Sequence, residues 1–206
     1  WSLYLTEYDR LLSPLRRRKD MGLLEIGTQN GGSMEIFGKY FPKARKLIGC
    51  DINPVCANLV FKDPRIAVVI GDVNTEDAEA EIMRHESAFD LIIDDGSHKS
   101  HDVIKSFTRY FNHLKYEGIY IVEDLHCSYW KEFDGGLYHP FSSLSFFKRV
   151  ADILNYEHWG IDKQRKSLIE GFAGHFSIEF DESSLTEIHS IEFLNSICVI
   201  RKKDLD

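Results

Sequence analysis

The sequence is poor in cysteine, and its four cysteines are scattered along the chain: Cys50, Cys56, Cys127 and Cys198. No two of them form a CxxC pair, so neither a disulfide framework nor a structural zinc site is expected. The sequence also lacks an apolar run long enough to cross a membrane and a recognisable signal peptide. These absences predict reduced thiols in a cytoplasmic protein that has no membrane partner.

Basic charge is the second shortage. The sequence holds 25 lysines and arginines against 33 aspartates and glutamates, which gives a net charge of -8. Binding to nucleic acid through phosphates needs clustered basic side chains, and the one basic run is Arg16–Lys19. We interpret this run as a solvated helix end or loop, so nucleic acid is not an expected partner.

Repeats, low-complexity segments and Pro/Gly linkers are absent as well. The 206 residues are 43% hydrophobic and 28% charged, which is an ordinary composition for a globular protein. We therefore expect one domain over residues 1–206.

Short apolar runs alternate with stretches of helical periodicity. This alternation predicts an α/β fold with a doubly wound, mostly parallel sheet. A polar turn at Asn195-Ser196 separates two further runs, which predicts a C-terminal antiparallel hairpin and brings the sheet to seven strands. The expected strands are Gly22–Ile26, Lys46–Cys50, Ile66–Ile70, Phe89–Ile93, Ile119–Val122, Ile188–Leu194 and Ile197–Arg201.

Helices are expected between the strands, each with one apolar face. Ser33 is predicted to cap a helix whose apolar residues are Met34, Phe37 and Phe41. A second helix has its apolar face at Val103, Ile104, Phe107, Phe111 and Leu114, and a third spans about Ser143–Tyr156. The segment Lys163–Ser184 has no clear pattern, except that Phe176–Phe180 alternates like an extra strand.

Acidic residues occur at the ends of the first five expected strands. In open α/β sheets, ligands bind at the carboxyl ends of the strands. The functional residues are therefore expected along one edge of the sheet.

The first expected strand is followed by a glycine-rich turn that leads into a helix. The sequence of this stretch is Leu23-Leu24-Glu25-Ile26-Gly27-Thr28-Gln29-Asn30-Gly31-Gly32-Ser33. Glycines let the backbone turn sharply and approach a ligand. A dinucleotide loop usually reads GxGxxG and holds a pyrophosphate at the helix N-terminus. Here the spacing is GxxxG, and Glu25 would repel a pyrophosphate. A carboxylate at this position suits a cationic ligand instead, although a dinucleotide stays open as the alternative.

Two acidic pairs, Asp94-Asp95 and Glu123-Asp124, follow neighbouring strands. Converging carboxylates need a cation or shared protons, and an all-oxygen ligand set suits Mg2+ or another hard divalent ion. The alternative is that one or more of these acids caps the following helix.

His98 lies three residues after Asp95. An alcohol that acts as a nucleophile must lose its hydroxyl proton, and histidine has the pKa range of a general base. A lone histidine in a loop is usually a surface residue, but its spacing from a candidate metal ligand favours a catalytic role.

With its glycine turn and its strand-end acids, the chain resembles the class I S-adenosylmethionine-dependent methyltransferases, which have a Rossmann-like fold. Their first motif is an acidic residue, any residue, and then GxxxG. The resemblance implies that Asp51 accepts hydrogen bonds from the ribose and that Asp72 lies near the adenine. The expected contacts to S-adenosylmethionine are Glu25, Gly27, Thr28, Gln29, Gly31, Ser33, Asp51, Ile52, Asp72, Val73 and Asp94.

A narrower resemblance covers Leu23–Trp130 and the terminal hairpin. Asp95-Gly96-Ser97-His98 and Glu123-Asp124, followed by Ser128-Tyr129-Trp130, are similar to motifs of metal-dependent sugar O-methyltransferases of macrolide and related glycoside biosynthesis. The resemblance implies metal ligands at Asp95, Glu123 and Asp124, and a base at His98. Tyr129 and Trp130 would line the acceptor site, with packing under a loop as the alternative.

We therefore expect a methyl donor, a divalent ion and a small-molecule or glycan acceptor. The expected reaction is O-methylation of a sugar hydroxyl of a glycoside or polysaccharide. Two alternatives stay open: a catechol or aromatic O-methyltransferase, and a non-catalytic cofactor-binding domain of a larger assembly protein. A homo-oligomer is compatible with this interpretation.

Overall fold

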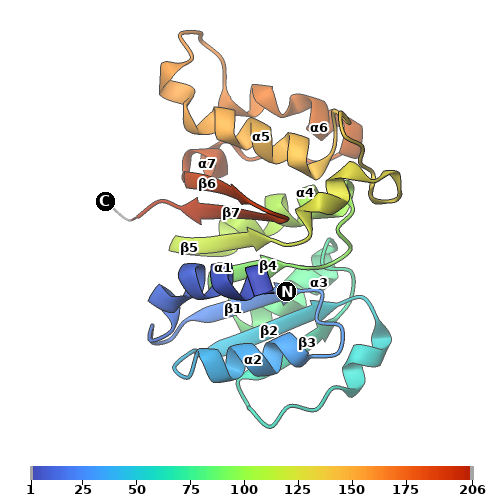
Figure 1. Cartoon of the computed structure of the whole chain (residues 1–206), viewed down its shortest axis with the longest axis vertical. Helices are drawn as coiled ribbons and strands as arrows, with labels where there is room; N and C mark the ends of the chain where they lie inside the picture. The colour runs from blue at the N-terminus through green and yellow to red at the C-terminus, as the bar shows by residue number, and fades with distance from the viewer. Residues whose placement is uncertain (1, 205–206) are drawn as a thin grey trace.

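A computed structural model describes residues 2–204 of the chain. Its centre is a seven-stranded sheet in the order β3-β2-β1-β4-β5-β7-β6 (Figure 1). Strands β1 to β5 are parallel, and β7 runs antiparallel to both β5 and β6. The expected fold class is confirmed. The strands are β1 (Gly22–Ile26), β2 (Lys46–Asp51), β3 (Ile66–Ile70), β4 (Phe89–Asp94), β5 (Leu114–Val122), β6 (Ile188–Leu194) and β7 (Ile197–Lys202).

Helices cover both faces of the sheet because successive strand residues point to opposite sides. Leu23 packs in one buried cluster with residues of α1 and α2, whereas Leu24 packs in the other with residues of α3, α4 and α5. The α-helices are α1 (Ser2–Leu12), α2 (Gly32–Tyr40), α3 (Glu76–His85), α4 (Ser100–Tyr110), α5 (Ser143–Leu154), α6 (Glu170–Phe176) and α7 (Glu182–Thr186). Short 3-10 turns lie at Ser13–Leu15, Pro54–Asn58, Phe111–His113, Leu125–Tyr129, Lys131–Phe133, Tyr156–His158 and Arg165–Leu168.

Three sequence expectations about local structure are wrong, two about helices and one about a strand. Ser33 does not cap α2; the N-cap is Gly31, whose φ of 76° is left-handed. Leu114 is the first residue of β5 instead of the last residue of a helical face, because the chain turns at Phe111–His113. The segment Phe176–Phe180 forms no strand: Phe176 ends α6, and Ile178 packs into the core beside the helices.

The basic run Arg16–Lys19 lies in the turn after α1, as expected. Arg18 reaches the buried Asp90 at 2.9 Å, and Arg16 lies over the ring of Tyr40. Arg18 thus binds to the start of β4, and Arg16 contacts α2. All four cysteines are buried and unpaired in disulfides.

In the sheet β1 and β4 are neighbours, although β2 and β3 separate them in the sequence. The order reverses between these strands, and ligands of open α/β sheets bind at such a switch point. The turn after β1 packs directly on the turn after β4, since Asp95 N donates to Ile26 O at 2.9 Å. Helix α1 begins at this same edge of the sheet (Figure 1).

Candidate functional site

Glu25 is a buried carboxyl group near the carboxyl end of β1, an interior strand of the sheet. It is 2% exposed, and it lines a cavity of about 770 Å³ at the carboxyl ends of β1, β4 and β5. Its Oε2 atom has no hydrogen-bond partner among the described residues. Burial raises the pKa of Glu25 to about 7, an effect that a hydrogen bond from Ser33 opposes and the charges of Glu123 and Asp51 reinforce. A buried acceptor with a free oxygen is suited to a cationic group of a ligand.

The turn after β1 requires glycine at its first position. Gly27 has a φ of 91°, and a Cβ there would lie 2.1 Å from the carbonyl oxygen of Asp95. Thr28, next in the turn, is buried with no partner for its hydroxyl among the described residues. The backbone of this turn is therefore both exposed to the cavity and fixed against the turn after β4.

Asp51 ends β2 and faces the same turn. Its Oδ2 atom accepts a hydrogen bond from Gln29 N at 2.7 Å, and its Oδ1 atom accepts one from Asn53 N at 2.8 Å. Ile52 follows Asp51 and is 70% exposed at the rim. The two backbone donors orient the carboxylate without using all of its acceptor sites.

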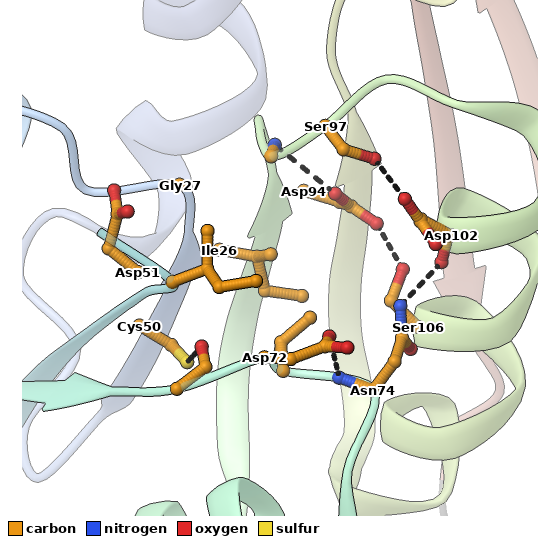
Figure 2. A pocket seen from close by; sticks show the side chains of 14 residues that line it. Ile26, Gly27, Cys50, Asp51, Asp72, Asn74, Asp94, Ser97, Asp102 and Ser106 are labelled. Carbon is orange, nitrogen blue, oxygen red and sulfur yellow. Dashed lines mark hydrogen bonds between the residues drawn. The ribbon is translucent and has the colours of Figure 1, made fainter. Parts of the chain in front are cut away.

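A smaller cavity of about 240 Å³ continues from Asp51 toward Asp72 (Figure 2). Asp72 accepts a hydrogen bond from Asn74 N at 2.9 Å, and Val73 also lines this cavity. The two cavities share Gly27, Asp51 and Gly96. Together they form one elongated site that runs from Asp72 to Glu25.

Asp94, like Glu25, is a buried acid of this edge. It is 3% exposed and accepts hydrogen bonds from the hydroxyl of Ser106 and from Gly96 N, the latter at 3.4 Å (Figure 2). Burial raises its pKa to about 6, and these hydrogen bonds oppose the rise. Asp94 thus closes the turn after β4 and forms part of the cavity wall.

Asp95, His98 and Asp124 converge at the opposite end of the larger cavity. One ligand atom from each lies within 4.8 Å of the others. Burial raises the pKa of Asp95 to about 8, and the charges of Glu123 and Asp124 add to the shift. Unpaired carboxylates this close together repel one another, so the arrangement is suited to a cation.

His98 and Asp124 both have left-handed backbones, with φ values of 58° and 47°. Non-glycine residues rarely adopt this conformation, and it concentrates at functional sites. His98 Nε2 lies 3.8 Å from Asp124 Oδ2. Burial lowers the pKa of His98, against the opposing charge of Asp124, which leaves the imidazole neutral and able to accept a proton.

Glu123 is close to this group but is not part of the three-residue convergence. Its carboxylate accepts a hydrogen bond from the hydroxyl of Tyr8 on α1. Burial raises its pKa, an effect that Tyr8 opposes. The structure thus unites two of the three expected metal ligands with the expected base, and it sets the third beside them.

Tyr129 and Trp130 are 45% and 46% exposed, so neither is packed under a loop. Neither lines the larger cavity itself. Trp130 contacts the ring of His126, with centroids 4.9 Å apart, and His126 Nδ1 lies 3.9 Å from Asp124 Oδ1. Trp130 is therefore linked to Asp124 through His126, whereas the exposed Tyr129 is not among the cavity-lining residues.

Three residues of the site carry no sequence signal that singles them out. Tyr4 and Tyr8 come from α1, and Ser196 comes from the β6–β7 turn. Tyr4 Oη donates to Asp124 Oδ1 at 2.8 Å, and Leu125 N donates to Ser196 O at 2.9 Å. Both ends of the chain therefore hold the loop after β5, a contact that no local pattern predicts.

Residues 24–125 match a family described as a methyltransferase domain. The chain contains a methyltransferase domain. The match begins inside β1 and ends just after the acidic pair of β5. It therefore includes the glycine turn, Asp51, Asp72, Asp95, His98 and Asp124.

Relatives of this domain include two curated enzymes. The 8-demethyl-8-alpha-L-rhamnosyl tetracenomycin-C 2'-O-methyltransferase of Streptomyces olivaceus is 30% identical over 76% of this chain and 42% of its own length. Demethylmacrocin O-methyltransferase of Streptomyces fradiae is 31% identical over 79% of this chain and 42% of its own length. The chain thus matches less than half of the length of these relatives.

Among solved structures, the fold is similar to that of the MycE methyltransferase from the mycinamycin biosynthetic pathway. The TM-score is 0.76 at 24% sequence identity, and the match covers 97% of this chain and 49% of that chain. That structure holds Mg, SAH and mycinamycin VI. The likeness establishes a Rossmann-like methyltransferase fold for this chain.

Proposed function

We propose that the protein is an S-adenosylmethionine-dependent and divalent-metal-dependent O-methyltransferase that acts on a sugar hydroxyl of a glycoside or polysaccharide. One observation carries the proposal: the Asp95–His98–Asp124 group adjoins the same cavity as the buried, half-unpaired carboxyl of Glu25. The names of the relatives support it, since both are O-methyltransferases and one is named for a rhamnosyl tetracenomycin.

The residues fit the methyl donor along the elongated site. Asp72 and Val73 would hold the adenine, and Asp51 and Ile52 the ribose. Glu25, with Ser33 and the backbone of Gly27–Gly31, would hold the amino-acid part, because the free Oε2 of Glu25 can accept from an ammonium group. The hydroxyl of Thr28, also without a partner among the described residues, lies in the same turn.

Asp95 and Asp124 would bind the divalent ion, with Glu123 as a third acid beside them. Carboxylate oxygens suit Mg2+ better than zinc. Such an ion would lower the pKa of an acceptor hydroxyl. His98 would take that hydroxyl's proton at Nε2, since its neutral imidazole faces Asp124 at 3.8 Å.

Tyr129 and Trp130 would bind the apolar face of the acceptor at the rim. Both residues are roughly half exposed, and Trp130 contacts His126, which lies 3.9 Å from Asp124. Residence in the cytoplasm, one domain over residues 1–206 and a homo-oligomer stay predictions. No helix within residues 2–204 is long and apolar enough to cross a membrane.

The test separates donor binding from catalysis. Asp124→Ala is expected to abolish methyl transfer while S-adenosylhomocysteine binding, measured by calorimetry, stays within about twofold of wild type. Asp152→Ala is the control, because Asp152 is an exposed acid on α5, remote from the cavity. Activity that persists in excess chelator would exclude the metal requirement.

The acceptor class is tested in the same assay by comparing methyl glycosides with catechol. If catechol is methylated and the methyl glycosides are not, the acceptor is an aromatic compound and the proposed sugar acceptor is wrong. Donor binding without turnover on any acceptor would instead favour a non-catalytic cofactor-binding domain.

A further inference from the structure

Two tyrosines of α1 point at two consecutive acidic residues after β5. Tyr4 and Tyr8 are one helical turn apart, so their side chains lie on the same face of α1. The hydroxyl of Tyr8 donates to Glu123 Oε1, and that of Tyr4 donates to Asp124 Oδ1 at 2.8 Å. Tyr4 Oη also accepts from Asp124 N at 3.4 Å. Each acid of the pair therefore has its own tyrosine hydroxyl as a hydrogen-bond donor.

The position of Glu123 follows from the Tyr8 contact. Glu123 lines the same cavity as Asp95 and Asp124, and its backbone N donates to Asp94 O at 2.9 Å, beside Asp95. Yet only Asp95, His98 and Asp124 have converging ligand atoms among the described residues. One oxygen of Glu123 is committed to Tyr8, which sets the carboxylate at the border of the convergent group.

Helix α1 does not depend on these two hydroxyls for its attachment. Leu11 and Leu12 are 1% and 2% exposed in the core, and Tyr40 of α2 donates to Asp9 at 3.1 Å. Arg10 pairs with Glu192 of β6. The tyrosine hydroxyls can therefore be removed while the helix stays packed on the sheet.

We propose that Tyr8, with Tyr4 beside it, is a positioning residue for the divalent-ion site. Each hydroxyl fixes the rotamer of one acid of the Glu123-Asp124 pair, so that Asp124 stays in the convergent group and Glu123 stays beside it. Groups that hydrogen-bond to metal-binding carboxylates usually contribute about tenfold to a hundredfold in metal affinity. This inference rests on the proposed function, since it assumes that the acidic group binds a divalent ion.

The experiment measures Mn2+ binding by electron paramagnetic resonance in the presence of S-adenosylhomocysteine. Tyr8→Phe keeps the ring and removes only the hydroxyl, and it is expected to weaken Mn2+ binding by about tenfold or more. Tyr4→Phe is expected to weaken it as well, and it serves independently if Tyr8→Phe fails to fold. Binding of S-adenosylhomocysteine alone should stay within about twofold.

Tyr40→Phe is the matched control. It removes a hydroxyl that is bonded to Asp9 of the same helix, but it leaves the acidic group untouched. If all three variants bind Mn2+ as wild type does, the positioning role is wrong while the metal site stands. If Tyr40→Phe weakens binding as much as Tyr8→Phe, the effect belongs to helix packing and the inference is overturned. Wild-type protein that binds no Mn2+ overturns the proposed metal site together with the inference.

Discussion

At the scale of single residues, Glu25 is the group whose environment demands a ligand. A carboxyl group that is nearly fully buried with an unpaired oxygen costs free energy unless a partner arrives or a proton binds. Its pKa of about 7 reflects this cost. A cationic ligand would favour the charged form and remove the penalty.

Glu25→Gln is expected to weaken S-adenosylhomocysteine binding by about tenfold to a hundredfold, because a hydrogen bond to a charged group contributes about 1.5–3 kcal/mol. The raised pKa also sets a pH dependence. Below about pH 7 the free protein holds Glu25 protonated, so wild-type affinity should fall as the pH drops from 8 to 5. Calorimetry at several pH values checks both effects.

The matched control is Glu35→Gln, an exposed acid in the first turn of α2. It should leave both the affinity and its pH dependence unchanged. A Glu25→Gln variant that kept the wild-type pH profile would assign the titration to another group.

At the scale of elements, the site depends on the contact between the turn after β1 and the turn after β4. Gly27 is the closest point of that contact. Its positive φ and its approach to the Asp95 carbonyl are two separate demands for glycine.

Gly27→Ala is expected to destabilise the protein by about 2 kcal/mol or more and to abolish donor binding, because the methyl group would displace Asp95. Urea unfolding measures the first effect and calorimetry the second. Gly160→Ala is the control for backbone strain alone: its φ is 67°, but nothing lies within 4 Å of an added Cβ. It should cost about 1–2 kcal/mol and leave donor binding intact. Equal losses of stability in the two variants would show that the turn contact contributes nothing.

The elements differ in how well local sequence predicts them. β1, β3 and β6 match their expected bounds, since each is a short run of strand-forming residues between turn signals. Phe176–Phe180 has the alternation of a strand, but it does not pair with any strand of the described sheet. Phe176 is the last residue of α6 instead. Ser33 has the chemistry of an N-cap, yet Gly31 takes that position because the turn needs a left-handed backbone there.

At the scale of the whole molecule, acidic groups of distant segments are gathered at one edge. Asp95, Glu123 and Glu25 all have raised pKa values, with burial as the main cause and mutual repulsion as a further one. A raised carboxyl pKa means that the folded chain binds more protons than the unfolded one between the two pKa values. The metal-free protein should therefore lose stability as the pH rises from about 4 to 8.

Mg2+ is expected to reverse this trend. Because the ion competes with protons for the same carboxylates, it should raise the melting temperature by several degrees at pH 8.5 and little at pH 5.5. Differential scanning calorimetry with and without Mg2+ tests this, with Asp95→Asn as the variant that should lose the response. Equal stabilisation at both pH values would show that the ion binds elsewhere.

The sequence by itself determined the parallel sheet, the glycine turn and the row of strand-end acids, because each depends on local composition and on the fixed chemistry of parallel strands. The tertiary structure alone decided how those acids are arranged. It united Asp95 and Asp124 with His98, turned Glu123 toward Tyr8, and left Tyr129 and Trp130 half exposed and outside the lining of the larger cavity. The reason is physical: the side-chain partners of the acidic pair come from α1, 115 and 120 residues away in the chain. Ser196 of the β6–β7 turn contacts the neighbouring His126 from 70 residues away. Such contacts follow from packing across the sheet, which no short sequence pattern specifies.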